Sequence, residues 1–490
     1  MAHPYQCILA SNAGSLDEFN WTLIGASGPK LVVQSCSGAR STWPKEKEEI
    51  AENGQGDEPN GPPGKRLKLS PPEEKAPNFS TMVMSNDSQY LVAITGEDKC
   101  IRVFQIDSDC QLQQLSQRCM PRRPSAITLT SDDSTILVAD KFGDVYALPL
   151  LPSPGEERNA IPTAEPSEAV TEKKFTPAAS VLTVHSGRNR KVLEEQMKQA
   201  ASLPPKPKET MKFKHDLLLG HVSMLTDVIY TTVESPVEGG KPRGYILTSD
   251  RDEHIRLSRG PPQAHIIEGF CHGHEQFVSR LCLTKSGLLV SGGGDTDLFV
   301  WDWLNSRFLE TLSIRDPVFD FLKTNKFESN LPDDKAHFNI AVSGIWNLPN
   351  KDSEFDEILV ACEGIPALFH FKVTGGKAAS SLSHVIAVNA NALGVAFIQP
   401  RESALQMIVS VDNVHKPAST TELRDEEHAS RLQYFSYSQA GGWSSQAGYH
   451  KQESDSEVGM EGARKGGDEK AARDILYNVE VLRKRPGAED

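Results

Sequence analysis

A short segment that recurs at a regular spacing constrains the fold of this chain more than any other feature. Each copy ends one β-rich run, passes through a turn and begins a second β-rich run. The four copies are Ala93–Phe104, Val138–Leu148, Thr248–Ser258 and Ser291–Trp301, with Asp98, Phe142, Asp252 and Asp295 at their turns. The steps between these turn residues are about 44, 110 and 43 residues, whereas a four-stranded propeller blade takes about 40–45. The long step therefore fits one blade plus an insertion.

Three stretches interrupt this repeat and are too polar to form a core. They are residues 44–77, 152–212 and 440–467, which are rich in Pro, Gly, Glu, Lys and Ser. Such segments cannot bury enough apolar area to offset the entropy of ordering them, and they explain why only 38% of the chain is hydrophobic. We predict disordered insertions at about 44–77 and 152–212, and a flexible linker at 440–467.

The remaining residues suffice for seven blades. Beyond the four copies, degenerate blades are predicted at Trp21–Trp43, Phe338–Val373 and Asn391–Ser438. The predicted fold class is all-β, a seven-bladed WD40-type β-propeller over residues 1–439, followed by the linker and a C-terminal helix and tail at 468–490. We expect the strand-like Tyr5–Ala10 to close the ring by joining the last blade, because closure removes exposed sheet edges.

One copy carries a complete set of side chains able to join the strands of a blade. The set is His274, Ser291, Asp295 and Trp301. An imidazole can donate to a carboxylate while its other nitrogen accepts a proton from a hydroxyl. The preceding copy has His221, Thr248 and Asp252, but Ser258 replaces the tryptophan. A Ser/His/Asp set resembles a catalytic triad, but its recurrence at blade spacing favours a structural tetrad.

Composition excludes several classes of function. The formal charge of -14 argues against a protein whose whole surface wraps nucleic acid, although local basic contacts stay possible. No apolar run approaches the roughly 18 residues of a membrane span, so we expect a soluble intracellular protein without membrane contact. The eight cysteines are scattered without a CxxC pair, which predicts mostly reduced core residues and no metal site. Phosphate-binding glycine motifs and nucleophile motifs are also missing, so we predict no catalytic residues.

The first insertion contains a basic cluster, Gly64–Lys68, between proline pairs. Clusters of this kind are read by nuclear import receptors, but they also occur as solvated charge runs in loops. The two interpretations have equal weight on sequence alone. The first of them predicts a nuclear protein.

Four segments carry a resemblance to a known family. They are Ile136–Tyr146, Gly220–Asp227, Ile246–Arg256 and Phe270–Arg280. They resemble the WD-repeat non-catalytic subunit of the eukaryotic tRNA (guanine-N7)-methyltransferase, and the long insertions look fungal. The resemblance implies a scaffold in a heterodimer with a Rossmann-like catalytic subunit. That partner would bind S-adenosylmethionine and form 7-methylguanosine at position 46 of tRNA, while this chain would carry no cofactor and meet tRNA through the complex.

The same segments suggest where such a partner binds. Asp140–Lys141 and Asp250–Arg251 occupy the same phase in neighbouring blades, so two acid–base pairs should emerge side by side. The resemblance implies that Arg256, on the following strand, pairs with a carboxylate of the catalytic subunit. The alternative is a solvated strand arginine, an interpretation that also applies to Arg102.

The C-terminal segment predicts an amphipathic helix with a basic end. Its apolar positions, which share one helical face, are Ala472, Ile475, Val479 and Leu482. The basic triplet Arg483, Lys484 and Arg485 is a candidate for contact with tRNA phosphate, although it could equally compensate the helix dipole. A different class of function, a WD-repeat adaptor of a ubiquitin ligase or chromatin complex, also fits the fold.

Overall fold

The computed structural model describes residues 3–13, 20–45, 76–107, 109–152, 191, 211, 213–235, 239–327, 331–332, 334–349, 355–376, 380–399, 405–424, 430–438, 442–446 and 473–484. The chain divides into two compact units, one of residues 1–156 and 214–490 and the other of residues 157–213. Everything described below belongs to the first unit. The predicted insertions lie almost entirely outside the described residues.

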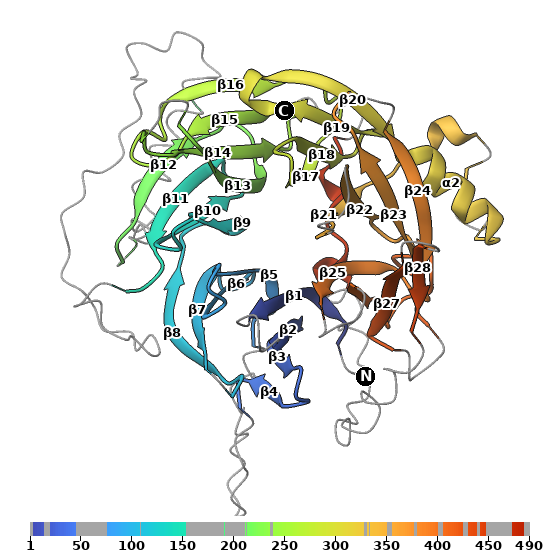
Figure 1. Cartoon of the computed structure of the whole chain (residues 1–490), viewed down its shortest axis with the longest axis horizontal. Helices are drawn as coiled ribbons and strands as arrows, with labels where there is room; N and C mark the ends of the chain where they lie inside the picture. Colours follow the sequence, from blue (N-terminus) through green and yellow to red (C-terminus); the bar gives the residue numbers. More distant parts are fainter. Residues whose placement is uncertain are drawn as a thin grey trace, which may run out of the picture. The chain divides into compact units, whose positions relative to one another are not determined.

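The first unit contains seven four-stranded antiparallel sheets, which form a seven-bladed propeller (Figure 1). Blade 1 is β1 (Tyr5–Ala13), β2 (Asn20–Ser27), β3 (Lys30–Ser35) and β4 (Arg40–Trp43), and blade 2 is β5 (Phe79–Met84), β6 (Tyr90–Thr95), β7 (Cys100–Ile106) and β8 (Leu112–Cys119). Blade 3 is β9 (Pro124–Leu129), β10 (Thr135–Asp140), β11 (Asp144–Pro149) and β12 (Asp216–Gly220). The predicted all-β propeller with seven blades is confirmed.

The other four blades have the same order. Blade 4 is β13 (Leu225–Val233), β14 (Arg243–Asp250), β15 (Ile255–Arg259) and β16 (Ile267–Cys271), and blade 5 is β17 (Val278–Leu283), β18 (Leu289–Gly293), β19 (Asp297–Asp302) and β20 (Arg307–Ser313). Blade 6 is β21 (Val342–Asn347), β22 (Asp356–Cys362), β23 (Ala367–Val373) and β24 (Ser381–Ala387), and blade 7 is β25 (Ala392–Ile398), β26 (Gln406–Val411), β27 (Leu432–Ser438) and β28 (Gly442–Ser445). The first strand of each blade lies innermost (Figure 1).

The ring closes without exchange of a strand, which differs from the expectation for Tyr5–Ala10. β1 pairs with β2 of its own blade, and blade 7 takes its fourth strand, β28, from the segment predicted as a linker. The propeller therefore extends beyond residue 439. Blades 1 and 7 meet through packing of Tyr5 and Ile8 against Ile408. Asn12 adds two hydrogen bonds, one from its amide to the Phe397 carbonyl at 3.2 Å.

The hydrophobic core lies between successive blades rather than at the centre of the ring. Between blades 5 and 6, for example, Val290 and Val300 pack with Val360 and Phe369. Every residue of β22 is buried, because both faces of this strand are covered by neighbouring blades. A helix that the sequence did not predict, α2 (Arg315–Thr324), joins the same core through Val318 and Leu322.

Cysteines mostly follow the prediction of reduced core residues, with one exception. Six are free, and the buried ones are Cys110, Cys271, Cys282 and Cys362. Burial raises the pKa of Cys362 to about 12, which keeps it a thiol. Cys100 and Cys119, by contrast, form a disulfide between β7 and β8. Within the described part of the chain, no helix is long and apolar enough to cross a membrane.

Candidate docking site

The predicted tetrad forms one chain of buried hydrogen bonds in blade 5. Nδ1 of His274 lies 2.7 Å from Asp295 Oδ2, and Nε2 lies 2.7 Å from Ser291 Oγ. The indole N–H of Trp301 donates to the same serine oxygen at 2.8 Å. The Ser291 side chain is fully buried, so it cannot meet a substrate as a nucleophile would. This geometry serves to join the strands of the blade.

Blade 4 builds the same chain with a different aspartate from the one predicted. His221 pairs with Thr248 at 2.8 Å and with Asp250, not Asp252, at 3.2 Å. Burial alone would raise the pKa of Asp250, but hydrogen bonds from His221 and from the His254 backbone outweigh it and lower that pKa. Asp250 is therefore an internal carboxylate, and its predicted role in partner binding does not fit its position.

Arg256 bonds to Ser258, the residue that stands in place of the tryptophan in blade 4. Its Nε donates to Ser258 Oγ at 3.0 Å and its Nη1 donates to the Gly220 carbonyl at 2.9 Å. The residue is buried, as is Arg102, which bonds to Thr95 and Asp98 in blade 2. Neither arginine is a solvated strand residue, and Arg256 bonds within the propeller, once to its own blade and once to blade 3.

Asp140 and Asp250 shape two equivalent turns. Oδ1 of Asp140 accepts hydrogen bonds from the amides of Phe142 and Asp144 at 2.7 and 3.1 Å. Oδ1 of Asp250 accepts from the amides two and four residues later, at 2.9 and 3.1 Å. The predicted equivalence of the two turns is thus present in the structure. Since both aspartates face inward, the turns present the residue that follows each of them, Lys141 and Arg251.

Lys141 is exposed and lies beside a second cation, Arg123. The Lys141 amide donates to the Arg123 carbonyl at 3.1 Å, and both residues line a small cavity of about 180 Å³. Partial burial and the charge of Arg123 lower the pKa of Lys141. Among the described residues, neither side chain has an ion pair or hydrogen bond. An anionic group from another molecule would meet two unpaired cations here.

Exposed apolar side chains lie next to these cations. Phe142 is 62% exposed and Val222 is fully exposed, and a hydrogen bond of 2.7 Å from the His221 amide to the Gly143 carbonyl holds their loops together. The Arg122 guanidinium lies 4.4 Å from the Phe142 ring centroid. We call Arg122, Arg123, Lys141, Phe142 and Val222 the blade 3 corner. The signal in the sequence was Phe142, which stands where the other copies have aspartate.

The C-terminal segment differs from the predicted continuous helix. Among residues 473–484, the structure has a helical turn at 473–476 and η5 (Glu480–Leu482), with a short non-helical link between them. Residues 468–472 and Arg485 lie outside the described residues. The segment from Arg473 to Lys484, here called the C-terminal clasp, crosses the loops of blades 4 to 7.

Arg483 anchors the clasp and is not free to contact phosphate. Its guanidinium donates to the carbonyls of Gly294 and Ile340 at 3.1 and 2.7 Å and to Gln276 Oε1 at 3.1 Å. It also lies 5.4 Å from the centroid of the Phe277 ring. Its side chain is only 17% exposed, so the predicted tRNA contact at this residue conflicts with its position.

Lys484 and Arg251 join the clasp to the blade 4 turn. The Lys484 ammonium pairs with Asp252 at 3.1 Å and with Glu253 at 2.9 Å. Arg251 Nε donates to the Leu482 carbonyl at 2.9 Å. Lys484 is thus paired within the chain, and Arg251, predicted to bind a partner, instead holds the clasp.

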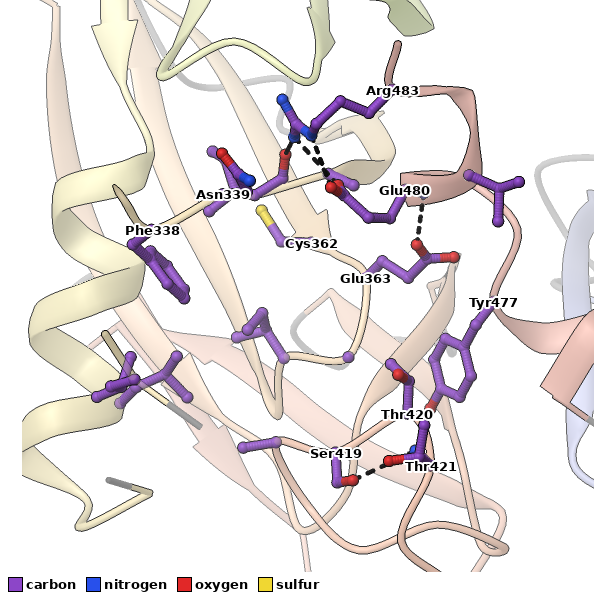
Figure 2. A pocket seen from close by; sticks show the side chains of 18 of the residues that line it. Phe338, Asn339, Cys362, Glu363, Ser419, Thr420, Thr421, Tyr477, Glu480 and Arg483 are labelled. Atoms are coloured by element: carbon purple, nitrogen blue, oxygen red, sulfur yellow. Dashed lines mark hydrogen bonds and ion pairs between the residues drawn. The ribbon is translucent and has the colours of Figure 1, made fainter. Parts of the chain in front are cut away.

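Blades 6 and 7 hold the other end of the clasp (Figure 2). Glu363 accepts hydrogen bonds from the amides of Val479 and Glu480 at 2.9 and 2.7 Å. Tyr477 donates to Asp412 and accepts from the Asn391 amide at 2.8 Å. Burial and the charge of Asp412 raise the pKa of Tyr477, which keeps its hydroxyl a donor. A cavity of about 700 Å³ remains between the clasp and α2.

The sequence matches the family model described as the tRNA methyltransferase TRM82 WD40 domain over residues 23–435. A protein of Phaeosphaeria nodorum, named tRNA (guanine-N(7)-)-methyltransferase non-catalytic subunit TRM82, is 55% identical, with 100% of both chains covered. The chain belongs to the TRM82 family. A Sclerotinia sclerotiorum relative of the same name is 37% identical, with 98% of each chain covered.

Membership of the TRM82 family confirms the resemblance predicted from the sequence. The protein is a non-catalytic subunit of tRNA (guanine-N7)-methyltransferase, so the prediction that it is no enzyme by itself is also confirmed. Among solved structures, "Structure of U3-55K" aligns with a TM-score of 0.51 and 12% identity, covering 88% of this chain and 94% of the other. That likeness shows the propeller fold alone.

Proposed function

We propose that this TRM82 protein binds the catalytic methyltransferase subunit through the blade 3 corner and holds it in its active form. The observation that carries the proposal is the exposed pair Phe142 and Val222 beside the unpaired cations Arg123 and Lys141. Binding hot spots combine buried aromatic anchors with cations in this way. A partner surface with an apolar pocket flanked by carboxylates is the complement of the blade 3 corner.

The charge distribution supports the inference that the two subunits contribute unequally to tRNA binding. This chain carries a net charge of -14, and two residues of its basic triplet, Arg483 and Lys484, are engaged within the propeller. Dense phosphate binding requires a cationic surface. We infer that the catalytic subunit binds S-adenosylmethionine and supplies most of the charge that holds tRNA, whose guanine 46 becomes 7-methylguanosine.

A nuclear location is also part of the proposal. It rests on the basic cluster Gly64–Lys68, which lies outside the described residues. Replacing Lys65, Arg66 and Lys68 with alanine and imaging the tagged protein tests it. Loss of nuclear accumulation supports an import signal, and unchanged distribution contradicts it.

Co-purification of the full-length chain with the catalytic subunit tests the docking proposal. Phe142→Asp places a charge in the apolar contact, so we expect at least a tenfold loss of recovered complex and of tRNA methylation, about 1.4 kcal/mol or more. Leu304→Asp is the control, because Leu304 is exposed on blade 5 away from the corner.

Two outcomes would contradict the proposal. If Phe142→Asp recovers the same amount of complex as Leu304→Asp, the blade 3 corner is not the docking site. If the wild-type chain recovers ubiquitin-ligase or chromatin components and no methyltransferase, the adaptor function is favoured instead.

A further inference from the structure

The disulfide between Cys100 and Cys119 joins residues that face each other across one strand pair. Cys100 begins β7, Cys119 ends β8, and the two are direct partners in the antiparallel register. The adjacent ladder bond, from the Met120 amide to the Lys99 carbonyl at 2.9 Å, marks them as a non-hydrogen-bonded pair. Side chains approach most closely in such pairs. The sheet therefore keeps the two sulfur atoms adjacent whether or not they are bonded.

The two sulfur atoms differ in their access to solvent. Cys119 is an exposed residue on β8, the outermost strand of blade 2. Cys100 lies on the inner neighbour strand and is only 1% exposed. Thiol–disulfide exchange depends on which sulfur a thiolate can reach, and exposed disulfides are the labile ones. Cys119 is the sulfur that a small thiol reaches.

The disulfide also links the β6–β7 turn to the loop that carries two arginines of the blade 3 corner. Cys100 follows the β6–β7 turn, and the Lys99 ammonium of that turn donates to the Pro121 carbonyl at 3.2 Å. Cys119 leads directly into the Met120–Arg123 loop. Arg122 and Arg123 of this loop belong to the blade 3 corner. A covalent bond at Cys119 thus limits the movement of the chain that positions both arginines.

We propose that Cys100 and Cys119 form a reversible thiol–disulfide site that exchanges with glutathione through Cys119 and restrains the Met120–Arg123 loop when oxidised. In reduction, a glutathione thiolate attacks Cys119 Sγ, and Cys100 leaves as a thiolate. A second glutathione thiolate attacks the glutathione sulfur of this mixed disulfide and releases Cys119. Two electrons pass to the protein, glutathione disulfide forms, and both cysteines take up the protons that the two glutathiones gave up.

The test uses the full-length chain without its partner, so its result does not depend on the proposed docking function. The chain carries Cys36→Ser to remove an exposed thiol outside the disulfide. It is equilibrated at graded ratios of glutathione to glutathione disulfide, alkylated and analysed by peptide mass. We expect one two-electron transition that involves both cysteines, with slower amide exchange at Arg122 and Arg123 in the oxidised form.

Single variants test the order of attack. In Cys100→Ser, Cys119 should carry glutathione at oxidising ratios and lose it at reducing ratios, because no protein thiol is left to form the disulfide. In Cys119→Ser, the buried Cys100 should stay unlabelled in the folded chain. The proposal is overturned if the disulfide of the folded chain does not respond to any glutathione ratio, if both single variants are labelled equally, or if amide exchange in the loop is the same in both forms.

Discussion

Arg256 donates a hydrogen bond at 3.0 Å to the hydroxyl of Ser258, the residue that stands at the register position of Trp301 in blade 5. Arg256 and Ser258 lie on β15, two positions apart, and both are buried. The arginine also satisfies the Gly220 carbonyl at the end of blade 3. One side chain thus completes its own blade and joins it to the preceding one.

We therefore expect Arg256→Ala to lower the stability of the isolated chain rather than to act directly on partner binding. Loss of the guanidinium leaves the buried Ser258 hydroxyl without its donor and breaks the hydrogen bond to the Gly220 carbonyl, which should lower the free energy of unfolding by about 1–3 kcal/mol. Denaturant unfolding of the isolated chain measures this. Arg307→Ala, at an exposed position, is the control and should change stability by less than about 0.5 kcal/mol. Unchanged stability together with lost partner binding would instead show that Arg256 contacts the partner.

The imidazole of His370 should make the propeller sensitive to mild acid. It is buried on β23, and among the described residues neither ring nitrogen has a hydrogen-bond partner. Burial lowers the pKa of His370 from 6.5 to about 4, and the charges of His384 and Lys372 add to the effect. The unfolded chain therefore binds a proton between these pH values that the folded chain does not. Stability should fall by up to about 3 kcal/mol from pH 6.5 to 4 and be fully present above 6.5.

Urea unfolding at several pH values measures this dependence. His370→Leu removes the titrating group and should flatten the curve between pH 6.5 and 4. His337→Leu, at an exposed site, should leave the wild-type slope unchanged. A steep acid dependence that persists in His370→Leu would assign the effect to other groups.

Arg483→Ala should loosen the C-terminal clasp. The guanidinium bonds to two carbonyls and a side-chain amide from blades 5 and 6, so its loss should cost about 2–3 kcal/mol of unfolding free energy. Lys484→Ala removes only half-exposed ion pairs and should cost less than about 1 kcal/mol. If Arg483→Ala kept full stability and weakened tRNA binding, the phosphate contact predicted from the sequence would be correct.

Lys141→Glu should weaken the complex in a salt-dependent manner. Reversing one of two unpaired cations places a negative charge opposite the partner's carboxylates, so we expect roughly a tenfold loss of affinity at low salt and a smaller loss at high salt. Surface plasmon resonance at two ionic strengths measures it. Lys323→Glu, on the exposed side of α2, is the matched control. Equal affinities for the two variants would exclude Lys141 from the interface.

The repeat predicted the propeller because each turn carries local signals, but residue roles depended on details that spacing does not contain. In blade 5, Asp295 stands four residues after Ser291, whereas in blade 4 the pairing aspartate, Asp250, stands two residues after Thr248. Counting along the chain selected Asp252, whose carboxylate instead pairs with Lys484. Backbone geometry at the turn decides which carboxylate faces inward.

The structure of the C-terminal clasp was also not predictable from local sequence, because it depends on contacts between distant residues. Its apolar spacing suited one continuous helix, yet Tyr477 and Val479 are buried against blades 5 to 7 between two short helical turns. Glu363 satisfies two amides that a helix would have paired internally. Contacts between residues more than 100 positions apart override the local preference, and one chain read by itself does not reveal them.

Because β1 pairs within its own blade, the propeller can assemble in the order in which it is synthesised. Blade 1 has all four strands once residue 43 has emerged from the ribosome, and each later blade packs onto a finished neighbour. A ring that shared a strand between its first and last blades would leave an unpaired edge exposed until translation ended. The clasp follows blade 7 in the sequence, so it secures the blades after they have formed.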